Sequence, residues 1–232
     1  MIVFIIALAP IAALIIYFYH KDKYEKEPIN LLTKAFLAGL IITLTAILIE
    51  SVINKFINPI KLFPLKIFLK AFLLAGLVEE GCKFYVFRSL IYHSKEFDEP
   101  YDGIIYAVMI SLGFATVENL AYVIAAYLKS GYVGVLQVGI IRAVFSVPGH
   151  ACWGVIMGYY FSLAKFTKDK NRERKYIYKG LGLAILAHGL YDFLLFTKTS
   201  FGVSYMIITS ILLWKFALRK IGIQVEKSPF KK

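Results

Sequence analysis

The stretch AVFSVPGHACWGVIMGYYFSLA, residues 143–164, has no charged side chain other than a single histidine. A helix needs roughly 20 mostly apolar residues to cross the hydrocarbon core of a bilayer. The stretch therefore predicts a membrane-spanning helix rather than part of a soluble domain. It also contains His150, a polar residue that is costly in contact with lipid.

Other uncharged runs repeat this pattern along the chain. Residues 1–19, 35–49, 103–117 and 199–214 also lack charges, and 59% of all residues are hydrophobic, against about 45–50% in average soluble domains. We predict an all-α, polytopic membrane helix bundle of about seven transmembrane helices. The predicted spans are 2–19, 31–53, 67–92, 102–128, 136–164, 179–197 and 204–218. Around 129–142 a broken or re-entrant segment is an alternative.

The basic residues are distributed unequally between the predicted loops. The net charge is +12, and sixteen Lys and Arg residues lie in segments 20–30, 93–101, 165–179 and 219–232. Only five lie in segments 54–66, 129–135 and 198–203. The positive-inside rule then predicts that the N-terminus lies outside and the C-terminus inside. The basic excess indicates contact with an anionic inner leaflet, and no motif indicates nucleic-acid binding.

The chain reads as a single integral membrane domain, 1–232, with a short basic tail from about 219. The first span lacks the charged start of a signal peptide, so we expect an anchor that is retained. The two cysteines, Cys82 and Cys152, lie inside spans without a metal-type spacing. We expect them to be small buried hydrophobic residues.

Polar residues inside the predicted spans are few. They are Glu50, Glu79, Glu80, Lys83, Glu118, Asn119, Arg142, His150, His188 and Asp192. Four of them come from consecutive spans, 9 to 16 residues from the predicted inner ends: Glu80, Glu118, His150 and His188. At about 1.5 Å per residue they lie within roughly 10 Å of one another in depth. We therefore predict that they meet in the interior of the bundle, where each can find a polar partner.

Local spacing predicts two side-chain pairs. Glu79 and Lys83 are four residues apart with the glutamate first, the favoured order for an ion pair on a helix. Glu80 then lies about 100° around the helix from Glu79, and one lysine cannot fully satisfy both carboxylates. His188 and Asp192 are one turn apart, so the carboxylate could orient the imidazole.

Four motifs follow one another on successive spans. They are Glu79-Glu80-x-x-Lys83, Phe114-x-x-x-Glu118-Asn119, His150-x-x-x-Gly154-x-x-x-Gly158 and His188-x-x-x-Asp192. Together they resemble the PrsW family of intramembrane proteases, within the larger group of CAAX prenyl endopeptidases and bacteriocin-immunity-type proteases. Two departures from the CAAX pattern, the position of Lys83 and the glutamate at 118, match the PrsW branch and argue against a prenyl-peptide substrate.

The resemblance implies a site-1-type cleavage of a single-pass membrane protein in the bacterial cytoplasmic membrane. The implied substrate class is a membrane-bound anti-sigma factor, cut on the outer side in envelope-stress signalling. An ion- or proton-coupled transporter is the alternative, because buried ionisable residues also form proton relays. A binding or immunity protein with an inactive site is a third possibility.

Peptide hydrolysis in a membrane needs an activated water and a group that stabilises the oxyanion. We expect Glu79 or Glu80 to activate the water, with Glu80 favoured because Lys83 can pair with Glu79. Asn119 is the predicted oxyanion donor.

The histidines have two possible roles. His150 and His188 either bind a metal or polarise the scissile carbonyl, and Asp192 orients His188. In the metal version Glu118 is the third ligand of a zinc ion, a donor set typical of hydrolytic zinc sites. In the other version no metal is bound and a glutamate acts alone as the base. The sequence leaves both versions open.

Overall fold

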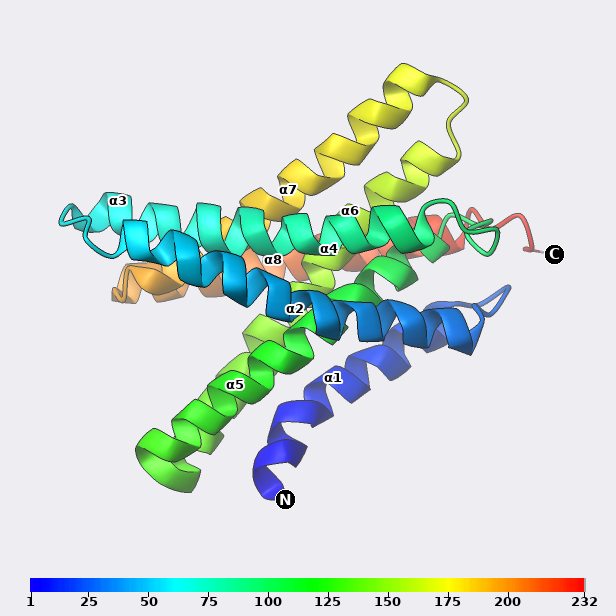
Figure 1. The fold of residues 1–232 in the computed structure, drawn as a ribbon. Coiled ribbons are helices and arrows are strands. Elements are labelled where there is room, and N and C mark those ends of the chain that lie inside the picture. The colour runs from blue at the N-terminus through cyan, green and yellow to red at the C-terminus, as the bar shows by residue number, and fades with distance from the viewer. Residues whose placement is uncertain (232) are drawn as a thin grey trace.

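Figure 1 shows the chain as a bundle of helices in a computed structural model that describes residues 1–231. The helices are α1 (Ile2–Lys21), α2 (Ile29–Ile57), α3 (Phe63–Phe68), η1 (Leu69–Glu79), α4 (Glu80–Val86), η2 (Phe87–Ile91), α5 (Asp102–Ile141), η3 (Arg142–Ser146), α6 (Val147–Lys165), α7 (Lys170–Phe196) and α8 (Ser200–Val225). The three η segments are π-helical. The described residues form no strand, which confirms the all-α prediction.

Five helical stretches among residues 1–231 are long and apolar enough to cross a membrane. They are Ile2–Lys21, Ile29–Ile57, Asp102–Lys165, Lys170–Phe196 and Ser200–Val225. The stretch Asp102–Lys165 has 64 residues and includes two of the predicted spans. The predicted span 67–92 corresponds to the run from α3 to η2, which is not one of the five. The number of crossings and their orientation therefore remain predictions.

α5 consists of two arms separated by a break in the helix. Ser130 and Gly131 have non-helical backbone angles, and the φ of Gly131 is +59°, a conformation that glycine adopts without steric cost. A β carbon on Gly134 would lie closer than 3.0 Å to the carbonyl oxygen of Ala126 on the first arm. The two arms therefore double back on each other. The break lies in the region around 129–142, where a broken or re-entrant segment was the alternative prediction.

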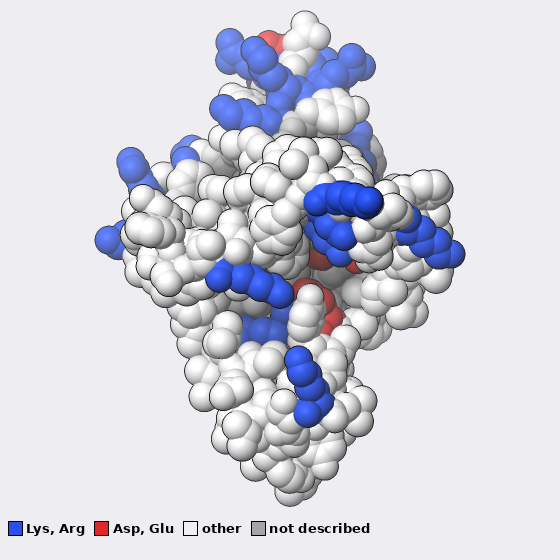
Figure 2. Space-filling view, turned by 90° about the vertical axis from the view of Figure 1, so that its left-hand side faces the viewer, with Lys and Arg blue, Asp and Glu red and all other residues white. Residues whose placement is uncertain are grey.

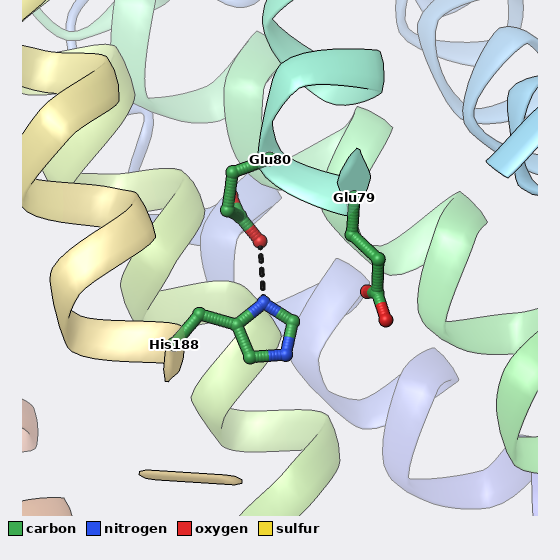
Figure 3. A group of neighbouring side chains, drawn as sticks. All are labelled: Glu79, Glu80 and His188. Carbon is green, nitrogen blue, oxygen red and sulfur yellow. Dashed lines mark hydrogen bonds and ion pairs between the residues drawn. The ribbon is translucent and has the colours of Figure 1, made fainter. Parts of the chain in front are cut away.

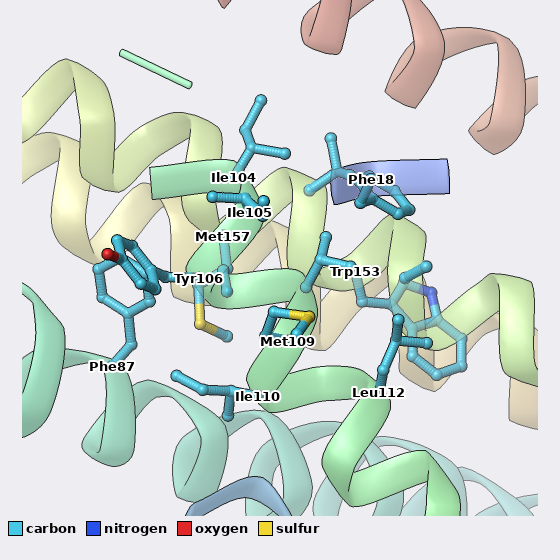
Figure 4. Close-up of a cluster of buried hydrophobic side chains, with 14 of the residues drawn as sticks. Phe18, Phe87, Ile104, Ile105, Tyr106, Met109, Ile110, Leu112, Trp153 and Met157 are labelled. Atoms are coloured by element: carbon cyan, nitrogen blue, oxygen red, sulfur yellow. The ribbon is translucent and has the colours of Figure 1, made fainter. Parts of the chain in front are cut away.

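The first arm of α5 is the centre of the core. Every residue from Asp102 to Thr116 is buried, and Figure 4 shows Ile104, Tyr106 and Leu112 of this arm among the side chains of its neighbours. A helix that is apolar on all sides suits a position surrounded by other helices.

Glycines allow two helices to approach this central arm at backbone distance. A β carbon on Gly158 of α6 would lie closer than 3.0 Å to the carbonyl oxygen of Gly103, and one on Gly113 would meet the carbonyl oxygen of Phe36 on α2 in the same way. Small residues commonly allow such close packing in membranes. Here they hold α2 and α6 against α5, and thereby set the positions of the polar side chains on these helices.

The C-terminal segment is more ordered than the sequence indicates. The basic tail was predicted from 219, but α8 continues to Val225. Ser228, beyond the helix, is buried and its hydroxyl donates a hydrogen bond to the carboxylate of Glu99. This contact ties the tail to the loop before α5.

Candidate active site

The polar residues of the spans meet at a cavity of about 270 Å³. Figure 2 shows acidic side chains in a hollow of the surface, with Lys and Arg side chains around it. The polar and aromatic residues that line the cavity are Glu50, Asn54, Lys70, Glu79, Glu118, Tyr122, Arg142, Ser146, His150, Trp153, His188, Tyr191, Asp192 and Phe196. They come from α2, η1, α5, η3, α6 and α7, so the cavity depends on the packing of helices from most of the chain.

The adjacent glutamates lie at a junction between two helix types. Glu79 is the last residue of π-helical η1, and Glu80 is the first residue of α4. Nζ of Lys83 lies 2.7 Å from Oε1 of Glu80 and 3.4 Å from Oε2 of Glu79. The predicted ion pair of Lys83 with Glu79 is present, but the lysine forms its closer contact with Glu80. Of the two carboxylates, Glu79 is the one that lines the cavity.

His188 is held between two carboxylates and an indole ring. Its Nδ1 lies 2.9 Å from Oε1 of Glu80, the contact drawn in Figure 3. Its Nε2 lies 3.5 Å from Oδ2 of Asp192, as the one-turn spacing predicted. The ring of Trp153 stacks on the imidazole with 3.6 Å between centroids. These contacts leave the imidazole of His188 little freedom to rotate.

His150 links Lys83 to a third glutamate. Nζ of Lys83 lies 3.2 Å from Nδ1 of His150, and Nε2 of His150 lies 2.7 Å from Oε2 of Glu118. Because a lysine ammonium only donates hydrogen bonds, Nδ1 is the acceptor and Nε2 carries the hydrogen that faces Glu118. The four motif-bearing spans are thus joined by direct polar contacts.

Arg142 lies between Glu118 and Asn119. Its Nη2 lies 3.3 Å from Oε2 of Glu118, and its Nε donates to Oδ1 of Asn119 at 2.7 Å. Asn119 is fully buried, but it is not among the cavity residues, and its amide donates to the carbonyl of Ala7. The oxyanion role of Asn119 stays a prediction that this geometry does not support. Arg142, which Asn119 contacts, does line the cavity.

Two groups of side chains could hold a metal ion. Glu79, Glu80 and His188 form one, and Glu79, Glu118 and His150 form the other, with the ligand atoms of each group within 4.8 Å of one another. The predicted trio of Glu118, His150 and His188 is not one of these groups, although each group contains part of it. Carboxylate oxygens and imidazole nitrogens are suitable zinc ligands. The buried Oε2 of Glu80 has no hydrogen-bond partner, so its lone pairs are free to coordinate a metal ion.

Some cavity residues had no role in the sequence interpretation. Arg142 and Glu50 were noticed only because charges are rare in spans. Tyr191 and Ser146, whose hydroxyl oxygens lie 3.0 Å apart, were missed. Tyrosine and small polar residues are ordinary in membrane helices, so no sequence signal separates these two from others of their kind.

Comparison with known proteins gives a consistent result. Residues 27–216 match the model of the PrsW family, described as intramembrane metalloproteases. The chain is 38% identical to Protease PrsW of Clostridioides difficile, over 94% of this chain and 89% of the relative. It is 40% identical to Protease PrsW of Geobacillus kaustophilus, over 92% and 88%. For Protease PrsW of Bacillus subtilis the identity is 37%, over 92% and 91%. No solved structure matches the chain significantly.

Proposed function

Because this chain belongs to the PrsW family of intramembrane metalloproteases, we propose that it performs a site-1-type cleavage of a single-pass membrane protein. Family membership makes it a multi-pass membrane protein and a protease. This decides between the protease and the transporter, since a transporter would move a solute and leave peptide bonds intact.

The convergence of acidic and imidazole side chains at one cavity carries the proposal. Glu79, Glu118, His150 and His188 line it together, and they come from η1, α5, α6 and α7. In lipid each of these groups is costly unless it is partnered. Bringing four of them to one cavity is explained by a need to bind and activate water there.

Glu79 is the best-placed base. It lines the cavity, whereas Glu80 is held by Lys83 and His188. As the water oxygen bonds to the scissile carbonyl carbon, Glu79 takes a proton from the water. It returns that proton to the amide nitrogen as the carbon–nitrogen bond breaks.

Two other groups complete the reaction site. Arg142 takes the oxyanion role first expected of Asn119, because the residue lines the cavity and its Nη2, although ion-paired with Glu118 at 3.3 Å, makes no hydrogen bond. A preformed donor of this kind stabilises the charge that develops on the carbonyl oxygen. His188, kept in place by Glu80 and Asp192, presents its ring to the same space.

The donor set fits a metal ion, and we assign Zn²⁺ as the metal. Glu79, Glu118 and His150 would hold it, with the alternative group of Glu79, Glu80 and His188. A zinc ion there would polarise the substrate carbonyl and lower the pKa of bound water. Glu79 belongs to both groups: with the ion it would be a ligand, and without the ion it is the base that takes the proton from the water. Purified active protein without stoichiometric metal, and without loss of activity on chelation, would contradict the assignment.

The distribution of basic residues and the family resemblance support a cut on the outer side. In Figure 1 the loops 22–28 and 92–101 and the C-terminus lie at the right, and the loops 58–62 and 197–199 lie at the left. Sixteen Lys and Arg residues lie in 20–30, 93–101, 219–232 and the connection 165–179, against five in 54–66, 129–135 and 198–203. Under the positive-inside rule this end faces the cytoplasm, which gives seven crossings with the N-terminus outside. The substrate class that suits this arrangement is a membrane-bound anti-sigma factor, as the family resemblance implies.

Co-expression with candidate single-pass anti-sigma factors tests the function. We expect a cleaved product with the wild type, and a loss of roughly 10²-fold or more in product formation for Glu79→Gln. Glu80→Gln, His150→Ala and His188→Ala should also lose activity. Glu226→Gln, on an exposed carboxylate, is the matched control and should cleave normally.

Each variant must be measured in the membrane fraction, so that loss of insertion is not mistaken for loss of catalysis. Glu79→Gln at wild-type level with wild-type cleavage would refute the assigned base. No cleaved product with the wild type, and none with any of the four site variants, would favour an inactive binding or immunity protein.

A further inference from the structure

We infer that α1 is a positioning element of the active site, and that Asn119 and Arg142 transmit its position to Glu118 and His150. The inference rests on the proposed roles of Glu118 and His150. The family model begins at residue 27, after the end of α1 at Lys21. Nothing in the family match therefore assigns this helix a part in catalysis.

A continuous series of short contacts connects α1 to the cavity. The side-chain amide of Asn119 donates to the carbonyl of Ala7 at 2.6 Å. Asn119 in turn accepts from Nε of Arg142 at 2.7 Å. Arg142 forms an ion pair with Glu118 at 3.3 Å, and Glu118 contacts His150 at 2.7 Å. No polar contact of comparable length links another part of α1 to the cavity in the described residues.

The acceptor on α1 lies one turn before a proline. Pro10 is inside the helix and lacks a backbone N–H, so the carbonyl of Ile6, four residues earlier, loses its helical donor. Proline is also a common site of a helix kink. Ala7 follows Ile6 and is fully buried. The carbonyl that accepts from Asn119 thus lies where α1 has one internal hydrogen bond fewer.

The N-terminal half of α1 packs against both arms of α5. Ala7, Val123 and Val135 are fully buried and form a small cluster of their own, separate from the main core. Val123 is on the first arm and Val135 on the second. A β carbon on Gly139 would lie closer than 3.0 Å to Cγ2 of Ile6. The second arm, which leads directly into Arg142, is therefore in close contact with α1.

These observations give α1 a mechanical role. Arg142 lies at the end of the second arm, and its guanidinium is fixed only through Asn119, Glu118 and the ring of Tyr122. Moving α1 removes the acceptor that orients Asn119, and Asn119 then no longer fixes Arg142. A displacement of about 1 Å in a positioning group can cost roughly 10²-fold in rate.

A pair of substitutions tests this without touching the cavity. Gly139→Ala forces Ile6, and with it α1, away from the second arm. We expect a fall in kcat of roughly 10-fold to 10²-fold, with KM changed less than about twofold because the displaced groups act on the transition state and not on substrate binding. Ile6→Ala alone should leave activity near wild type. The double variant Ile6→Ala/Gly139→Ala should regain most of it, because the clash is removed.

Asn119→Leu probes the same connection from the other end. Leucine has a similar volume, but it makes neither the hydrogen bond to Ala7 nor the one from Arg142. We expect the same loss of kcat as for Gly139→Ala. If both changes act through one connection, Gly139→Ala added to Asn119→Leu should cause little further loss. Gly222→Ala, where a β carbon meets nothing within 4 Å, is the matched glycine control.

A cysteine pair reports the position of α1 independently of activity. Ile6 Cβ lies 3.8 Å from the place of a β carbon on Gly139, a distance typical of disulfides. Ile6→Cys/Gly139→Cys should therefore cross-link on mild oxidation. Failure to cross-link would overturn the placement on which the inference depends.

The outcomes separate the inference from the proposed function. Inactive Glu118→Gln and His150→Ala with a fully active Gly139→Ala would refute the role of α1 alone. A loss in Gly139→Ala that Ile6→Ala does not rescue would refute it as well, since the defect would lie in the second arm itself. Active Glu118→Gln and His150→Ala would refute the proposed catalytic residues, and with them the inference.

Discussion

Replacing Lys83 with methionine should be strongly destabilising, because this lysine compensates two buried carboxylates. The side chain of Lys83 is 1% exposed, and those of Glu80 and Glu79 are 0% and 10% exposed. Removing one partner of a buried ion pair leaves an uncompensated charge and costs about 3–5 kcal/mol. We expect a loss of this size in the free energy of unfolding of Lys83→Met, measured by circular dichroism during titration with sodium dodecyl sulfate.

The chain contains a matched control for this substitution. Lys170 and Glu173 are also three residues apart, at 2.8 Å, but the side chain of Lys170 is 90% exposed. Lys170→Met should cost under about 1 kcal/mol, because solvent screens an exposed pair. The difference between the two variants isolates the effect of burial.

A double variant tests the cause. Lys83→Met/Glu80→Gln removes both members of the closer pair, and replacing a buried pair with neutral groups is often close to neutral in stability. We therefore expect it to regain about half or more of the loss. A cost of Lys83→Met equal to that of Lys170→Met, or a double variant as unstable as the single one, would refute the reasoning.

Three further outcomes follow from the geometry. Gly158→Ala should cost about 1–3 kcal/mol of unfolding free energy, because the backbone of α5 cannot move away, whereas Gly182→Ala, with open space, should not destabilise in the same titration. Burial raises the pKa of Glu99 to about 7. The contribution of its neutral carboxyl to the free energy of unfolding is therefore complete below about pH 4.5 and is lost as pH rises through 7. Glu99→Gln should remove this part of the pH dependence of thermal unfolding. Asp192→Asn should lower kcat roughly 10-fold in the cleavage assay by loosening His188, and an unchanged kcat would count against an orienting role.

Much of the site could be predicted because polar residues are costly in lipid. Glu118, His150 and His188 are each the exception in an apolar run, and their depths agree because helix rise per residue is constant. The structure places all three at one cavity. Tyr191 and Ser146 could not be found in this way, since neither residue type is unusual in a span.

The depth of a residue along its helix does not determine in which direction around the helix axis its side chain points. Neighbouring residues differ by about 100°, so the side that faces the cavity depends on how a helix packs. Lys83 was predicted to pair with Glu79. It does so, but it lies closer to Glu80, since the π-helical turn of η1 ends between the two carboxylates. Asn119 is a second example, because its amide donates to the carbonyl of Ala7, on a helix 112 residues earlier in the chain, and the residue does not line the cavity.

The sequence by itself determined that this chain is a helical membrane protein with one level of buried acidic and imidazole groups. Uncharged runs of the right length require helices in a bilayer, and a polar residue among them requires a polar partner. Tertiary structure alone decided which groups become partners. The close contacts of Gly158 and Gly113 set the helix separations, and the break at Gly131 turns Arg142 back toward Asn119. These contacts join residues far apart in the chain, and no local pattern encodes the angle at which two helices meet.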